Sequence, residues 1–220
     1  DPRTAHALRR NMEGTEARFI EDVIELQSYF QPAEPAQAVR AVPGAGLGVP
    51  VWLLGSSTFS ADLAAALGLP FAFAAHFAPD LLGTALMRYR SRFQPSAQLP
   101  KPHAMVCLTV CAAPDDAEAA FLFTSQQRAF VNLRRSQPGL LPRPAPLDGV
   151  WSERERAGVE HALAYAMVGG PARVAAGLAG FMAEFRPDEL MIACQIHDHA
   201  LRRRSYEIVR ELRGGLSKAA

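Results

Sequence analysis

The sequence predicts an α/β protein built on a parallel sheet. Apolar runs that fit buried strands alternate with amphipathic stretches of roughly 10 to 20 residues that fit helices. Four strand candidates occur, and a helix candidate follows each of them, which favours repeated βα units. Hydrophobic residues make up 49% of the 220-residue chain, enough for a packed core. We therefore expect a globular protein.

The first helix is expected over residues 15–30. Phe19, Val23 and Phe30 recur there at helical spacing with acidic residues between them. Pro32 follows, and a connection rich in glycine and proline comes after it. The helix is therefore expected to end before this proline.

The other elements are predicted from apolar runs, caps and stop residues. Val51 lies in an apolar run typical of a strand buried on both faces, and Gly68 fits the end of the helix after it. Asp115 stands three residues before Glu118, in the form of a helix cap. We expect strands over 49–54, 71–75, 104–112 and 189–195, and helices over 56–67, 80–93, 115–135, 152–165, 172–184 and 198–212.

One long irregular loop is expected over residues 136–150. It holds four prolines and two glycines, a composition that suits neither a helix nor a central strand. Ser152 and Glu155 beyond it match a capping box, which predicts the start of the next helix.

Charge and apolar patterning argue against two classes of protein. The formal net charge is +1 and the basic residues are scattered, so a nucleic-acid partner is not favoured. The longest apolar stretch, residues 63–77, is broken by Gly68 and Pro70. It is shorter than the roughly 20 residues that cross a bilayer, so no membrane anchor is expected.

The cysteines and the first residues favour a cytoplasmic protein. Cys107, Cys111 and Cys194 are too few for a disulfide framework. The first two alternate on one expected strand, so they point to the same face and are expected to pack. The chain begins without an export signal, and the lack of an initiator Met suggests truncation.

Several separated motifs resemble the luciferase-like, flavin-dependent monooxygenases. No Gly-x-Gly-x-x-Gly turn follows any expected strand, which weakens a dinucleotide-binding fold and leaves part of a barrel as the alternative. The family's fifth to eighth strands and their helices are resembled by residues 51–60 (VWLLGSSTFS), 67–79 (LGLPFAFAAHFAP), 105–112, 130–135, 188–192 (DELMI), 196–200 (IHDHA) and 204–207 (RSYE).

The resemblance implies a TIM-type (β/α)8 barrel of which this chain supplies strands five to eight. Residues 1–5 look like the segment just after the family's fourth strand. The upstream strands, with the histidine-bearing loop and the arginine that face the flavin in relatives, would then be absent. We expect residues 1–220 to be one domain, the C-terminal two-thirds of the family protein, which would lack half of the active site by itself.

The turn after the first expected strand is the leading candidate for a cofactor site. Gly55 allows a ligand to approach the backbone closely, and a helix that starts there suits a phosphate. Ser57 and Ser60 would add hydroxyl donors, and the resemblance implies that Gly55, Ser56, Ser57 and Ser60 bind the phosphate of reduced FMN. A serine that merely caps the helix is the simpler alternative. The turn at 169–171 is a rival phosphate site, since it also opens a helix.

Three further features bear on the chemistry. His76 follows a strand end and is the candidate catalytic residue, with Phe77 near the flavin ring, although a purely structural histidine is the alternative. His197 and His199 invite a metal hypothesis, but their side chains should diverge and no third ligand is evident. By resemblance, the 136–150 loop is a mobile lid that excludes water from the flavin, and a plain surface loop is the alternative.

The resemblance implies a monooxygenase that uses reduced FMN and O2 on a small organic substrate. The deazaflavin F420 is a related possibility. A flavin reductase is expected as a partner, and the chain is expected to form a homo-oligomer or to associate with its missing half, because an incomplete barrel exposes sheet edges. The alternative from another class is a non-catalytic flavin-binding or assembly protein on the same scaffold.

Overall fold

The structure, a computed structural model, describes residues 15–216 and divides them into two compact units between Val51 and Trp52. The resemblance of residues 1–5 to the segment just after the family's fourth strand lies outside the described residues. The single-domain organisation expected from the sequence stays a prediction.

The first unit contains helix α2 (Thr15–Phe30), with the bounds that the sequence predicts. Val23 is buried against its neighbours. The glycine-rich connection folds back onto the end of the helix, because the Gly48 amide donates to the Phe30 carbonyl at 3.0 Å. This hydrogen bond satisfies one of the carbonyls that a helix end leaves without a helical partner.

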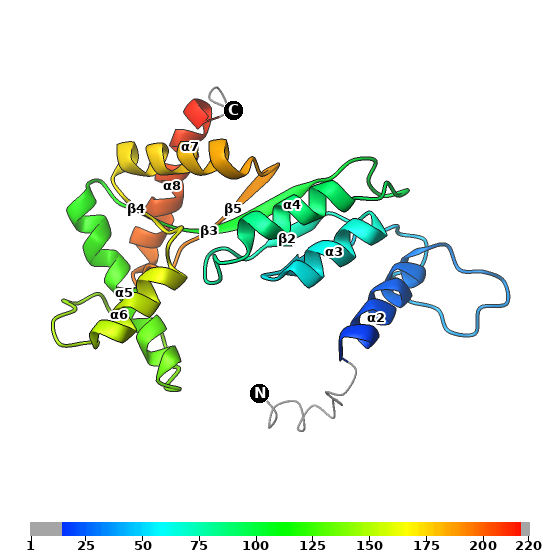
Figure 1. Cartoon of the computed structure of the whole chain (residues 1–220), viewed down its shortest axis with the longest axis horizontal. Helices are drawn as coiled ribbons and strands as arrows, with labels where there is room; N and C mark the ends of the chain where they lie inside the picture. The colour runs from blue at the N-terminus through cyan, green and yellow to red at the C-terminus, as the bar shows by residue number, and fades with distance from the viewer. Residues whose placement is uncertain (1–14, 217–220) are drawn as a thin grey trace. The chain divides into compact units, whose positions relative to one another are not determined.

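The second unit is built on a parallel sheet, as predicted (Figure 1). Its strands follow the order β1-β2-β3-β4, and β5 also pairs with β3. The long central strand β3 therefore joins the other parts of the sheet. The strands are β1 (Leu53–Gly55), β2 (Phe71–Phe73), β3 (Ala104–Ala112), β4 (Met167–Gly169) and β5 (Glu189–Ala193).

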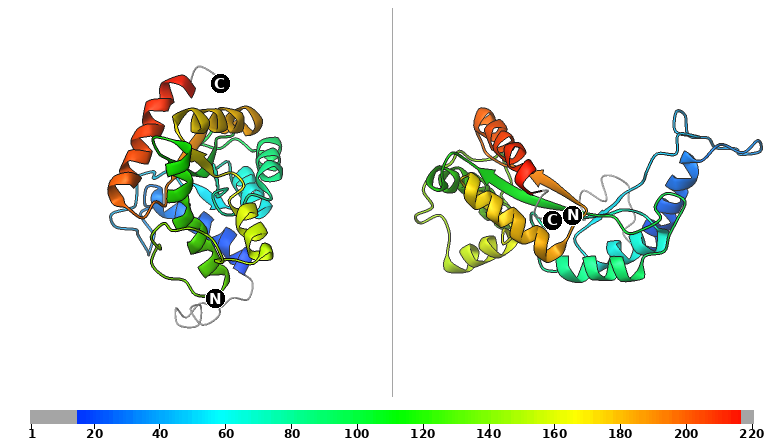
Figure 2. Two further views of the ribbon diagram at one scale, coloured as in Figure 1. Left: turned by 90° about the vertical axis from the view of Figure 1, so that its left-hand side faces the viewer. Right: turned by 90° about the horizontal axis from the view of Figure 1, so that it is seen from above.

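Helices follow the strands in the order that the sequence predicts. Asp115 caps α5 by accepting from the Glu118 amide at 2.9 Å, and Ser152 with Glu155 forms the expected capping box of α6. Figures 1 and 2 show α3 and α4 lying side by side. The helices are α3 (Thr58–Leu67), α4 (Leu82–Arg92), α5 (Asp116–Arg134), α6 (Glu153–Ala162), α7 (Pro171–Phe185) and α8 (His199–Leu216).

Several bounds differ from the prediction, for example those of β2, β5 and α6, which are shorter than expected. Three differences have a physical reason. Strand β1 has three residues because its partner β2 begins only after Pro70, whose carbonyl accepts from the Leu53 amide. Strand β4 was not expected, since three residues carry too little periodicity to be recognised. Helix α8 continues through Gly214 and Gly215, which permit a helix end but do not require one.

The two faces of the sheet differ in burial. Phe71, Phe73 and Val106 are fully buried. The positions between them form the other face, where Leu54 is aligned with Ala72 and Met105. On that face Leu54 is 66% exposed and Met191 53% exposed, so an apolar row is open to solvent in the described residues.

Tyr89 holds the amino-terminal ends of two strands together. Its ring is fully buried and lies 5.5 Å from the ring of Phe71. Its hydroxyl oxygen lies 2.9 Å from the Leu69 carbonyl oxygen and accepts from the His103 amide at 3.0 Å. One buried phenol therefore ties the segment before β2 to the segment before β3.

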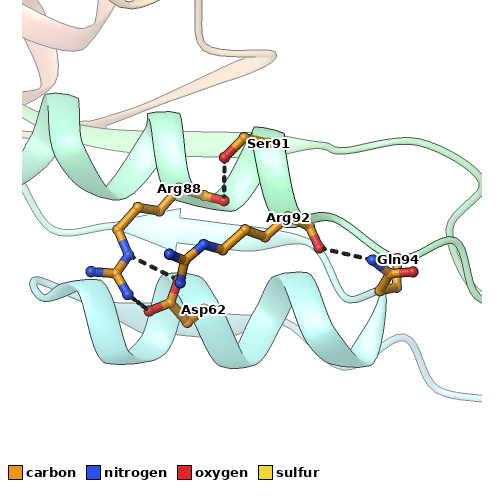
Figure 3. A network of polar contacts seen from close by, with 5 residues as sticks. All are labelled: Asp62, Arg88, Ser91, Arg92 and Gln94. Carbon is orange, nitrogen blue, oxygen red and sulfur yellow. Dashed lines mark hydrogen bonds and ion pairs between the residues drawn. The ribbon is translucent and has the colours of Figure 1, made fainter.

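Ion pairs join α3 to α4 along their outer sides (Figure 3). Asp62 accepts from Nε of Arg88 at 3.0 Å, and the second Arg88 nitrogen reaches the other carboxylate oxygen. Arg92 donates to the same carboxylate at 3.1 Å. The side chain of Asp62 is 29% exposed, so these pairs are partly shielded from water.

Candidate functional site

In the turn between β1 and α3, the N-cap residue of the helix makes no side-chain hydrogen bond to the helix backbone. Ser57 occupies the N-cap position of α3 with an extended backbone, but its side chain makes no capping hydrogen bond. The first turn of the helix holds no acidic residue. The simple capping role, which was the alternative reading of this serine, is therefore not the one that Ser57 adopts.

Gly55 and Ser60 face each other across this turn. A Cβ atom on Gly55 would lie 2.5 Å from Cβ of Ser60 and closer still to its hydroxyl. Only glycine fits here, because the Ser60 side chain occupies the space beside the Gly55 backbone. The close approach expected at Gly55 is thus made by Ser60 and not by open space for a ligand. The features that suit a phosphate ester are the Ser60 hydroxyl and the helix N-terminus, whose dipole favours negative charge.

The rival turn at residues 169–171 already holds an anion. Oδ1 of Asp116 accepts from the Gly170 amide at 2.7 Å. The same atom would lie 2.7 Å from a Cβ placed on Gly169. Because a carboxylate occupies the start of helix α7, a phosphate there would be repelled.

The segment after β2 lies beside the turn after β1. The Ala74 amide donates to the Gly55 carbonyl at 3.0 Å, which joins the carboxyl ends of the two strands. His76 and Phe77 follow directly, with their rings 4.6 Å apart and nearly perpendicular. Both predicted features therefore lie at the same edge of the sheet, the edge where α/β proteins bind ligands.

A pocket of about 320 Å³ opens at this edge. The predicted residues His76 and Phe77 line it, whereas Gly55, Ser56, Ser57 and Ser60 do not. Most of the wall comes from helix α5 and from the loop after it. The lining residues are His76, Phe77, Gln126, Ala129, Phe130, Asn132, Leu133, Pro138, Gly139, Leu140 and Gln195.

His76 is the single titratable side chain among the lining residues. Burial lowers the pKa of its imidazole below the usual 6.5, so the ring is neutral at pH 7. Its Nδ1 atom is buried and has no hydrogen-bond partner within residues 15–216. Because leaving an N–H unpaired and buried is costly, this position favours the neutral form whose ring proton lies on Nε2.

A buried hydrogen-bonded chain ties the pocket wall to the segment that carries His76. The Gln126 side-chain amide donates to the Thr109 hydroxyl at 3.1 Å. That hydroxyl reaches the His76 carbonyl oxygen at 3.5 Å. Both side chains are buried, with 2% exposure each. The chain links α5, β3 and the segment after β2.

Helix α5 supplies a part of the pocket that was not predicted from the sequence. Gln126 lies on the buried side of that helix, where a polar residue is unusual, and this was the available signal. Gln195 lies two residues beyond the end of β5, as His76 lies beyond β2. Its position after a strand end was a second signal.

The expected loop over 136–150 is irregular and reaches the pocket. It starts at Ser136, whose positive φ of 57° ends helix α5. Its far end is attached, since the Ala145 amide donates to Thr124 and Arg135 donates to the Val150 carbonyl. Leu140 lines the pocket and yet is 97% exposed, so it extends from the loop into solvent.

The remaining candidates do not join the pocket. His197 and His199 are exposed, and His199 lies against Arg202. Among residues 15–216, no three histidine, cysteine or acidic side chains gather closely enough to hold a metal ion. Burial raises the pKa of the Cys111 thiol to about 12.

No helix among residues 15–216 is long and apolar enough to cross a membrane.

Fold and site define an α/β protein with a pocket at the carboxyl edge of a parallel sheet, and comparison with known proteins assigns its family. The model of the luciferase-like monooxygenases matches residues 4–189, so the chain belongs to this family. A relative described as a luciferase-like monooxygenase, from Escherichia coli (strain K12), is 51% identical over 214 residues. That match covers 97% of this chain and 64% of the relative, so the chain spans less than two-thirds of its relative's length.

Two solved structures are similar to this chain in fold. Apo-MsnO8 is 29% identical with a TM-score of 0.79, and the match covers 96% of this chain and 64% of that one. A riboflavin lyase, RcaE, solved with modified FMN and riboflavin, is 17% identical with a TM-score of 0.56, over 96% of this chain and 60% of that one. The second likeness shows a shared fold alone.

Proposed function

We propose that the protein containing this chain is a flavin-dependent monooxygenase that uses reduced FMN and O2 on a small organic substrate. The observation that carries the proposal is the turn at Gly55, where a glycine under a serine hydroxyl opens a helix that has no side-chain cap. Family membership supports the same reaction class.

The phosphate of FMN would be held by Gly55, Ser56, Ser57 and Ser60. The hydroxyls and the helix N-terminus supply hydrogen-bond donors, and no carboxylate stands in the first helical turn to oppose them. Reduced flavin, when bound, supplies the electrons with which O2 is activated. The residues named here would bind and orient the flavin. None of them has a charged side chain.

His76 and Phe77 would lie near the flavin ring or the substrate. Phe77 is 47% exposed and offers an apolar surface for a planar ring. His76, neutral at pH 7, would donate one hydrogen bond from Nε2 and remain uncharged in an apolar site. By moving in from solvent, where Leu140 now extends, the residues from Pro138 to Leu140 would cover the pocket and keep water out.

The four strands β1, β2, β3 and β5 would form part of a TIM-type barrel. Their parallel pairing and the exposed apolar row through Leu54 and Met191 support this, because the inner face of a barrel is filled by side chains of all its strands. A second segment of protein would then be needed to complete the site.

A comparison of FMN with riboflavin tests the phosphate assignment, because riboflavin has the same ring and no phosphate. Each is titrated into the protein and followed by quenching of flavin fluorescence. We expect FMN to bind at least about tenfold more tightly, the equivalent of one or two charge-assisted hydrogen bonds. Equal affinities would refute the phosphate site.

Oxygen consumption tests the activity. A monooxygenase should consume O2 with reduced FMN and incorporate one oxygen atom into an added substrate. Tight FMN binding without any such turnover would favour the non-catalytic flavin-binding alternative, and binding of F420 in preference to FMN would favour a deazaflavin enzyme.

A further inference from the structure

The side chains that line the pocket beside His76 carry no charge. None of its lining residues is aspartate, glutamate, lysine or arginine, and burial keeps its histidine neutral. Apolar side chains such as Phe130 and Leu133 make up much of the wall. A charged group placed against the buried side chain of Gln126 would lose hydration without gaining an opposite charge, which is costly.

Amide side chains supply most of the remaining polarity. Gln126, Asn132 and Gln195 line the pocket, and amides offer both donors and acceptors without charge. Of the three, Gln126 is the most deeply placed, at 2% exposure. A deep, oriented amide on an otherwise apolar wall is the usual means by which a pocket fixes a ligand's orientation.

The hydrogen bonds of Thr109 determine how the amide of Gln126 is turned. A threonine hydroxyl has one proton, and the His76 carbonyl can only accept. At 3.1 Å the Thr109 hydroxyl accepts from Nε2 of Gln126, and its own proton is directed to the more distant His76 carbonyl, 3.5 Å away. The amide oxygen of Gln126 takes no part in this pair, and Gln126 is one of the residues that line the pocket. This oxygen is therefore the acceptor that Gln126 can offer to a ligand.

We propose that this pocket binds an uncharged organic molecule bearing an amide or hydroxyl group, and that Gln126, oriented by Thr109, recognises that group. Gln126 accepts from the ligand N–H or O–H, while His76 is the nearby donor for a ligand oxygen. The inference depends on the proposed function only in regarding this molecule as the substrate.

A matched pair of probes tests the preference for an uncharged ligand in the unaltered protein. The amide 2-naphthamide and the carboxylate 2-naphthoate share one ring system and differ in charge. Calorimetric titration at pH 8 without flavin should give at least about tenfold tighter binding of the amide, the cost of burying an uncompensated charge. Equal or tighter binding of the carboxylate, or no measurable binding of the amide, would overturn the proposal.

Variants test the role of Gln126. Gln126→Leu keeps the approximate volume and should weaken 2-naphthamide about fivefold to tenfold, the effect of one buried hydrogen bond. Gln127→Leu, one residue along the same helix and outside the pocket, should leave the affinity unchanged. Circular dichroism checks the fold of both. Unaltered affinity in a folded Gln126→Leu protein would refute the recognition role.

Thr109 is tested as a positioning residue by rescue. Thr109→Val removes the hydroxyl and should weaken 2-naphthamide, whereas Thr109→Ser restores it and should recover most of the affinity. A merely structural role would leave the amide-to-carboxylate ratio unchanged in Thr109→Val. These titrations contain no flavin, so a negative result for 2-naphthamide does not bear on the FMN proposal. In the same way, failure of FMN to bind does not bear on the proposed role of Gln126.

Discussion

At Gly55 the side chain is excluded by a single neighbour, the Ser60 side chain. Gly55→Ala should therefore destabilise the protein by about 1 to 3 kcal/mol, as overpacking does, and weaken FMN binding by moving Ser60. Thermal unfolding and FMN titration measure both effects. Gly83→Ala is the matched control, since its Cβ would meet Phe185 at an ordinary 3.8 Å. Comparable losses in both variants would contradict the close approach at Gly55.

Ser57 is the residue at which added charge should be most harmful to cofactor binding. Ser57→Asp places a carboxylate at the N-terminus of α3, where it repels a phosphate while it stabilises the helix. We expect FMN affinity to fall at least about tenfold and the melting temperature to hold or rise. Ser91→Asp on α4 should leave FMN affinity unaltered, and a Ser57→Asp protein that still binds FMN normally would count against the site.

At the scale of elements, Asp62 joins α3 to α4 through two arginines. Asp62→Asn removes the charge and keeps the shape, and should lower the free energy of unfolding by about 1 kcal/mol, at the upper end for partly exposed pairs. The loss should shrink at high salt. Chemical denaturation measures it, with Glu207→Gln on the exposed side of α8 as the control expected to change stability by less than about 0.5 kcal/mol.

The capping box of α6 should respond to acid. Hydrogen bonds from Arg135, and then from Ser152, lower the pKa of Glu155 from 4.5 to about 2. A carboxyl whose folded pKa is lowered stabilises the fold above its unfolded pKa, and this contribution is lost as the pH falls from about 4.5 towards 2. The stability difference between the protein and Glu155→Gln should therefore narrow across this interval. A difference that does not vary with pH would contradict the assignment.

Many of the helices and strands could be predicted from the sequence. The helix bounds at Asp115 and Ser152 follow from local capping chemistry, and the long strand β3 follows from an uninterrupted apolar run. Gln126 and Gln195 could not be placed in one pocket, because their meeting with His76 depends on contacts between residues far apart in the sequence. The family resemblance was confirmed, while the phosphate residues stay a prediction.

At the scale of the whole molecule, the exposed apolar row on the sheet should drive association. Replacing Leu54 and Met191 together by serine removes much of its apolar area, and should reduce self-association in light scattering at increasing protein concentration. Met87→Ser removes an equally exposed but isolated apolar side chain on α4 and should have little effect. Equal behaviour of the two variants would contradict the importance of this face.

The phenol of Tyr89 has a consequence for how this scaffold tolerates change. It fastens the entry points of β2 and β3 at the sheet edge remote from His76, with hydrogen bonds that involve only main-chain groups of its partners. Substitution of Leu69 or His103 by any residue other than proline leaves these main-chain groups in place. The hydrogen bonds of Tyr89 can therefore persist while the side chains at these two positions change. The loops at the opposite edge can then diversify for new ligands while the strands that carry them keep their alignment.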